Sequence, residues 1–150
     1  MTTYLLDTNI SSELIRNPFG SAARRVEEID PRDICTSIVV AAELRYGCAK
    51  KGSAKLLAKV ESLLDTIPVL PLDIPADTNY GGIRAELEGA GQMGLNDLLI
   101  AAHACALNLT LVTDKTREFL RIRGLNVENW LERQSVRLER VPLKLMRLER

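Results

Sequence analysis

The sequence predicts an α/β domain with a central, mainly parallel sheet flanked by helices. Short apolar stretches alternate with helical segments along the 150 residues, the pattern of strands joined by crossover helices. Hydrophobic residues make up 46% of the chain, which supplies a full core at this length. We therefore expect one compact domain.

The first half of the chain contains two expected strands and the helices that follow them. Residues 4–6 form a short apolar strand, and residues 9–16 form a helix that stops before a proline. Residues 33–36 form the second strand. Ser37 is an expected N-cap for a helix over residues 38–46, with Gly47 at its end.

The middle and second half continue the alternation. Residues 53–65 are clearly amphipathic, and residues 67–72, interrupted by two prolines, form an edge strand or extended segment. A helix over residues 77–88 precedes a glycine-rich loop. Asn96 is expected to cap a helix over residues 97–107. Two further segments complete the order, a strand over 109–112 and a last structured element over 126–130.

Four acidic residues follow short apolar runs or helix starts: Asp7, Glu43, Asp97 and Asp114. Side chains at the carboxyl ends of parallel strands meet at one edge of the sheet, so we expect these carboxylates to converge. At an effective dielectric of about 20 and a separation of about 5 Å, each like-charge pair costs on the order of 3 kcal/mol. Such a cluster needs protons or cations, and Mg²⁺ or Mn²⁺ prefers oxygen ligands.

Composition narrows the class of protein. Lys plus Arg and Asp plus Glu both number 20, so net charge does not indicate nucleic-acid binding, and any such surface must be local. Cys35, Cys48 and Cys105 lie in apolar stretches without metal-binding spacing, which indicates buried thiols in a reducing compartment. The N-terminal residues MTTYLLDTN show no basic region followed by a long apolar stretch, and no apolar window is long enough to span a membrane. We therefore expect a cytoplasmic protein.

Five blocks of the sequence stand in a characteristic order: LLDTN at 5–9, SIVVAAE at 37–43, NDLLIAAHA at 96–104, VTDKTREF at 112–119 and GLNVENW at 124–130. Together they resemble the PIN-domain ribonucleases, and among them the VapC toxins of bacterial toxin–antitoxin pairs. The resemblance covers residues 3–130 in order. It implies a PIN-like three-layer fold, with a PIN domain over 1–130 and a C-terminal extension of unknown role over 131–150.

The resemblance implies a metal-dependent endoribonuclease in which Mg²⁺ or Mn²⁺ activates water for attack on an RNA phosphodiester. Asp7, Glu43 and Asp97 would be its metal-binding and catalytic carboxylates. Asp114 matches a position that is Asp or Asn in the family, which implies a secondary role. Supporting polar residues are expected to be Thr8, Asn9, Ser37, Thr113 and Glu118. Glu118 can also act in place of Asp114, or simply brace its loop.

Lys115 departs from the family pattern, which has a polar uncharged residue after the fourth acidic position. Its ammonium can pair with Asp114 or contact an RNA phosphate. A basic rim for RNA is expected from Arg45, Lys50, Lys51, Lys115 and Arg117, against the ordinary alternative of a solvated helix face.

The family resemblance further implies an RNA substrate, often tRNA, a cognate antitoxin partner and a homodimer or a hetero-oligomer with the antitoxin. A catalytically weak PIN-like module that binds RNA or protein is the alternative, and Lys115 favours it. A haloacid-dehalogenase-type phosphatase would need a second Asp where Asn9 stands. The GxGxxG pattern at residues 89–94 follows a helix and not a strand, so we expect a turn there. His103 is expected to be a core residue.

Overall fold

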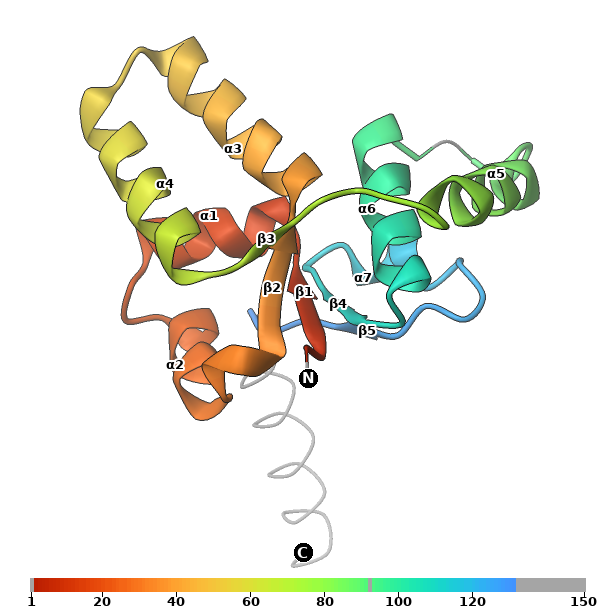
Figure 1. Ribbon diagram of the computed structural model, residues 1–150, viewed down its shortest axis with the longest axis horizontal. Coiled ribbons are helices and arrows are strands. Elements are labelled where there is room, and N and C mark those ends of the chain that lie inside the picture. Colours follow the sequence, from red (N-terminus) through yellow and green to blue (C-terminus); the bar gives the residue numbers. More distant parts are fainter. Residues whose placement is uncertain (1, 92, 132–150) are drawn as a thin grey trace, which may run out of the picture.

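A computed structural model describes residues 2–91 and 93–131 (Figure 1). The sheet has five strands in the order β3-β2-β1-β4-β5, and every pairing is parallel. The predicted α/β fold with a central parallel sheet is therefore confirmed. The strands are β1 (Tyr4–Leu6), β2 (Ile34–Ser37), β3 (Val69–Leu70), β4 (Thr110–Val112) and β5 (Val127–Glu128).

Helices connect the strands and cover both faces of the sheet. In Figure 1 the α3–α4 hairpin and the α5–α6 pair extend to the two sides of the view, and side chains of both pairs meet in one core cluster, whereas α1 and α2 contribute to the other cluster. The helices are α1 (Thr8–Arg16), α2 (Ser21–Glu28), α3 (Ile38–Lys51), α4 (Ala54–Thr66), α5 (Ala76–Leu87), α6 (Leu95–Ala106) and α7 (Thr116–Phe119), with a 3₁₀ turn η1 (Pro31–Asp33) before β2.

The core has two parts because successive strand residues point to opposite faces of the sheet. Leu5, paired with Cys35 and Leu111, belongs to the larger cluster, which packs against α3, α5 and α6. Leu6 and the fully buried Trp130 belong to the smaller cluster, which includes side chains of α1 and α2. Helices on both faces explain why these strands are continuously apolar.

The end of α3 corrects one prediction. Gly47 does not stop this helix, which continues to Lys51 because Leu44 and Cys48 are both buried and extend its apolar face beyond the glycine. Gly52 is the C-cap, in the left-handed conformation with φ of 63°. Ser37 is the N-cap as predicted, since its side chain accepts a hydrogen bond from the Val39 backbone N–H.

The start of α6 corrects another prediction. Gly94 is the N-cap and Asn96 already lies in the first turn, so the Asn96 side chain is available for a contact elsewhere. Helix α2 was not predicted at all. It buries only Ala22, and half of the eight residues in this segment are charged, which leaves few apolar residues from which a helix could be predicted.

The predictions on membrane spans and on the cysteines can be compared with the described residues. None of their helices has the length and apolar character needed to cross a membrane. The three cysteines are unpaired, with Cys35 and Cys48 buried and Cys105 partly buried. The proposed extension over 131–150 lies, apart from Leu131, outside the described residues.

Candidate active site

Asp7 lies at the centre of the sheet's carboxyl edge, because β1 runs between β2 and β4. Its side chain is 3% exposed and caps α1 by accepting a hydrogen bond of 3.0 Å from the Ile10 backbone N–H. Burial raises the pKa of Asp7 to about 6, against hydrogen bonds from Thr113 and Ile10 that lower it. The neighbouring Asp114 charge raises this pKa further. Holding Asp7 ionised here therefore costs free energy, which a cation can offset.

Glu43 reaches the same edge from the second turn of α3, and two polar side chains fix its carboxylate. The Thr8 hydroxyl donates a hydrogen bond to Oε1, and Asn96 Nδ2 donates to Oε2 at 3.0 Å. These contacts join the starts of α1 and α6 to α3. They leave the carboxylate oriented and partly buried.

Asp97 lies in the first turn of α6, where free backbone N–H groups favour an anion. Lys115 Nζ lies 3.1 Å from Asp97 Oδ2. The sequence analysis expected Lys115 to meet Asp114 or a phosphate, and the ion pair with Asp97 is a different arrangement. Burial lowers the pKa of Lys115, but Asp97, Asp7 and Glu43 raise it more, so the net direction is upward.

Asp114 is exposed and stands at the outer side of this group. Asn9 Nδ2 donates to Asp114 Oδ1 at 3.0 Å. The effect of Asp114 on the pKa of Asp7 shows that the two carboxylates are close enough to interact. Asn9 and Thr8 therefore each hold a different acidic side chain.

The four acidic residues thus form one electrostatic group with an ammonium among them. A hollow beside Lys115 is lined by Glu43, Asp97, Asn96, Gly94 and Leu95. Within the described residues, no three acidic, histidine or cysteine side chains are placed to hold one metal ion together. The donor chemistry nevertheless fits a hard divalent cation, because the group offers carboxylate oxygens and one of them, on Asp97, already binds a positive charge.

The remaining predicted polar residues occupy varied positions. Thr113 is fully buried, and its Oγ1 accepts a hydrogen bond of 3.0 Å from the Lys115 backbone N–H. Ser37 is buried and lies 2.8 Å from Nδ1 of His103, so His103 is a core residue as expected. Glu118 is exposed in α7. Its backbone carbonyl accepts a hydrogen bond from Arg121 Nε.

The residues of the predicted basic rim make different contacts in different parts of the fold. Arg45 is paired with Glu61 at 2.8 Å, Lys50 lies over the Tyr46 ring, and Lys51 lines a groove between α1, α3 and α4. Arg117 is exposed in α7. Lys115 is the member of this set that contacts an acidic residue of the candidate site.

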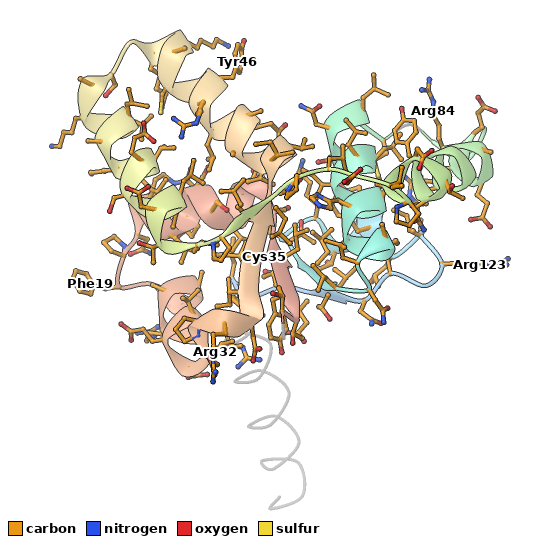
Figure 2. The ribbon with its side chains drawn as sticks, in the orientation of Figure 1. Phe19, Arg32, Cys35, Tyr46, Arg84 and Arg123 are labelled. Atoms are coloured by element: carbon orange, nitrogen blue, oxygen red, sulfur yellow. The ribbon has the colours of Figure 1, made fainter. Side chains whose placement is uncertain are left out.

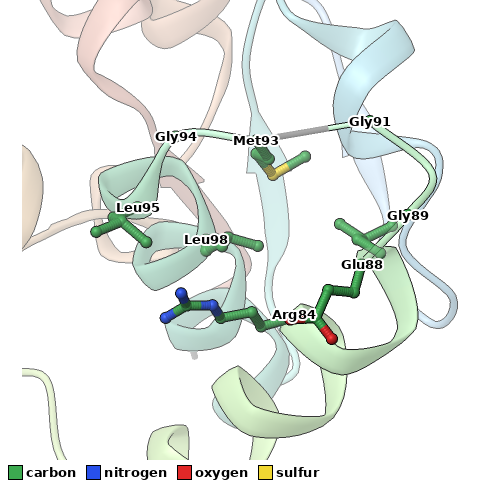
Figure 3. Close-up of a pocket in the computed structure, with 9 residues that line it drawn as sticks. Arg84, Glu88, Gly89, Gly91, Met93, Gly94, Leu95 and Leu98 are labelled. Atoms are coloured by element: carbon green, nitrogen blue, oxygen red, sulfur yellow. The ribbon is translucent and has the colours of Figure 1, made fainter.

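A second hollow adjoins the site, between α5 and α6 (Figure 3). Gly94 and Leu95 line both hollows, and Arg84 stands on the far side of the second one. The GxGxxG sequence forms the connection between these two helices, with Gly89 and Gly91 at positive φ. It follows a helix, as expected of a turn and not of a dinucleotide-binding loop.

Sequence reasoning missed two features of this group. Asn96 was assigned to a cap, whereas it binds Glu43 from 53 residues away. The pairing of Lys115 with Asp97 was also missed. The sequence held one signal for each: Asn96 directly precedes Asp97, and Lys115 directly follows Asp114.

Comparison with known proteins identifies a family and several relatives. The family model described as PIN domain matches residues 4–125. The tRNA(fMet)-specific endonuclease VapC of Shigella flexneri is 39% identical over 132 residues, covering 87% of this chain and 99% of the relative. Ribonuclease VapC2 of Rickettsia felis is 39% identical over 130 residues, covering 85% and 97%.

Solved structures give the same result. DNA-bound VapBC from Salmonella typhimurium matches with a TM-score of 0.79 and 36% identity, over 87% of this chain and 99% of that chain. VapBC2 from Rickettsia felis, bound to a DNA fragment from its promoter, matches with a TM-score of 0.78 and 36% identity, over 86% and 99%. The chain belongs to the PIN-domain family, within its group of VapC ribonucleases.

Proposed function

We propose that this protein is a Mg²⁺- or Mn²⁺-dependent endoribonuclease, the toxin of a type II toxin–antitoxin pair, which cleaves structured RNA and specifically tRNA. The observation that carries the proposal is the acidic group at the carboxyl edge of the sheet, in which Asp97 contacts Lys115 at 3.1 Å and Asp7 and Glu43 lie within electrostatic range of the same ammonium. Family membership supplies the nuclease class.

Asp7, Glu43 and Asp97 would hold the metal, with Asp114 in a secondary role. A bound divalent ion supplies an activated water and stabilises charge on the departing oxygen of the phosphodiester. Asp7 contributes from a fixed position, because it is buried and caps α1. Thr8 and Asn96 orient Glu43, as outer hydrogen-bond partners commonly do for metal ligands.

The proposed substrate is tRNA because a relative that is 39% identical is named a tRNA(fMet)-specific endonuclease. Phosphate contacts would come from exposed basic side chains near the site, such as Arg117 and Lys51. Arg45 would have to leave Glu61 to take part. We place this activity in the cytoplasm, which suits a chain with free thiols.

The proposed partner is a cognate antitoxin, since the matching solved structures include VapBC complexes. A groove lined by Ile15, Leu44, Leu56 and Val60 leads to Glu43, so a partner segment there would also block the acidic group. Tyr46 of α3 is 65% exposed and projects into solvent in Figure 2. We also propose the homodimer that the family resemblance implies, which the mass in solution will test.

Purified protein, freed of any copurifying partner, should be incubated with total tRNA and separately with messenger RNA, in Mg²⁺, Mn²⁺ or EDTA. Asp97→Asn is the test variant. Asp77→Asn is its matched control, because Asp77 lies in the first turn of α5 and is exposed. Discrete tRNA fragments made by wild type and Asp77→Asn, and lost in EDTA and in Asp97→Asn, are expected.

Cleavage by a well-folded Asp97→Asn protein would refute the site. Mn²⁺ binding without cleavage of either RNA would favour the second candidate, a non-catalytic PIN-like module that binds RNA or protein. The Lys115–Asp97 ion pair favours this alternative, since it engages a proposed metal ligand.

A further inference from the structure

Lys115 contributes the positive charge that faces the acidic group. Its Nζ is 3.1 Å from Asp97 Oδ2, and the two side chains are 38% and 23% exposed. Asp7 and Glu43 also interact electrostatically with this ammonium. Lys115 contacts one carboxylate and lies within electrostatic range of two more. Its charge therefore has a larger effect than that of a lysine on a solvated helix face, where a single exposed ion pair contributes little to stability.

The backbone of Lys115 is anchored, so the direction of its side chain follows from the fold. The Lys115 N–H donates to the buried Thr113 hydroxyl. Its carbonyl accepts a hydrogen bond of 3.2 Å from the N–H of Phe119, which is fully buried. The residue is thus held between the end of β4 and the start of α7, beside the first turn of α6.

We propose that Lys115 is an internal counter-ion that competes with the divalent metal and thereby sets the metal affinity of this site. The inference rests on the proposed function, because it takes Asp97 as a metal ligand. The ammonium lies on the carboxylate that the ion would use. Two positive charges at one carboxylate repel each other, so metal binding must either move the ammonium away from Asp97 or overcome this repulsion.

The counter-ion has two opposite effects. In the metal-free protein it reduces repulsion among Asp7, Glu43 and Asp97, and so stabilises the fold. In the metal-bound protein it adds a like charge near the ion, and so weakens binding. Removing the charge while keeping the length of the side chain should therefore tighten metal binding and destabilise the metal-free protein.

The test is a calorimetric titration of the metal-free full-length protein with Mn²⁺, for wild type, Lys115→Met and Lys115→Arg. Lys59→Met is the matched control, because Lys59 is an exposed lysine on α4. Removing a neighbouring cation should tighten the Mn²⁺ dissociation constant of Lys115→Met about tenfold. Lys115→Arg and Lys59→Met should remain close to wild type. Lys115→Gln serves as a second neutral variant if the methionine variant does not fold.

Thermal unfolding gives an independent readout. In EDTA the melting temperature of Lys115→Met should fall below that of Lys59→Met, and saturating Mn²⁺ should raise it more than it raises wild type. A structural role alone would lower the melting temperature without tightening Mn²⁺ binding.

The outcomes separate this inference from the proposed function. If the neutral variants bind Mn²⁺ with equal or weaker affinity than wild type, and wild type shows metal-dependent RNA cleavage, the counter-ion role of Lys115 is refuted and the nuclease function stands. No Mn²⁺ binding by any variant, together with no cleavage by wild type, overturns both.

Discussion

Replacing Asp7 by asparagine should stabilise the metal-free protein at neutral pH, although Asp7 is a proposed catalytic residue. Burial raises the Asp7 pKa from 3.8 to about 6. Each pKa unit is equivalent to about 1.4 kcal/mol, so the ionised carboxylate costs the folded state about 3 kcal/mol at most. Asparagine carries no such charge and is an equally good N-cap for α1.

The sign of the pH dependence follows from the same shift. Between pH 3.8 and about 6 the folded state holds the Asp7 proton that the unfolded state has lost, so this group's contribution to stability falls as the pH rises through that window. The advantage of Asp7→Asn should therefore reach its full value above about pH 6 and vanish towards pH 4.

Urea unfolding in EDTA measures this difference, with fluorescence of the buried Trp130 as the probe. Asp77→Asn is the control, because Asp77 is exposed in the first turn of α5 and its replacement should change stability by less than about 0.5 kcal/mol. Mg²⁺ should stabilise wild type and not Asp7→Asn. A less stable Asp7→Asn protein at neutral pH, or an advantage that does not depend on pH, would refute the reasoning.

Three further predictions concern the site and α3. Asp114→Asn should lower single-turnover RNA cleavage by less than about tenfold, since this side chain is exposed and its asparagine variant keeps a ligand oxygen; a complete loss would make Asp114 a primary ligand. Thr8→Val removes the hydrogen bond that orients Glu43 and should weaken Mn²⁺ binding about tenfold or more in a titration, where unchanged binding would contradict the proposed orienting role. Gly52→Ala should destabilise the protein by about 1 kcal/mol because Gly52 has φ of 63°. Gly47→Ala, whose added carbon meets nothing within 4 Å, should stabilise it by up to about 1 kcal/mol, and urea unfolding that ranks the two glycine variants oppositely would contradict this.

Local chemistry was sufficient to predict the parallel sheet and the strand-end position of Asp7. It also predicted Ser37 as the N-cap of α3, because a serine directly before an apolar helix can accept a hydrogen bond from a free backbone N–H of the first turn. The predicted end of α3 was wrong because the sequence offers two glycines that could end the helix, Gly47 and Gly52. Tertiary burial of Cys48, which follows the first glycine, decides between them.

The contacts of the site were harder to predict because they join distant elements. Asn96 is a plausible cap by itself, and only the folded chain brings Glu43 to its amide. Lys115 has Asp114 as its sequence neighbour, yet its ammonium lies on Asp97 of another helix. Sequence indicated the types of residue in the group, whereas their pairing depends on how α3, α6 and α7 meet.

In the proposed reaction, water activated by the metal attacks the phosphodiester, and no protein nucleophile takes part. The most direct test follows the oxygen atom of that water into the product. Wild type should cleave tRNA with Mg²⁺ in water labelled with heavy oxygen, and the new terminal phosphate should be analysed by mass spectrometry. Incorporation of one heavy oxygen atom per cleavage, with no product from Asp97→Asn, is the expected result. An unlabelled cyclic phosphate as the first product would contradict the claim, because it requires attack by the ribose hydroxyl instead of water.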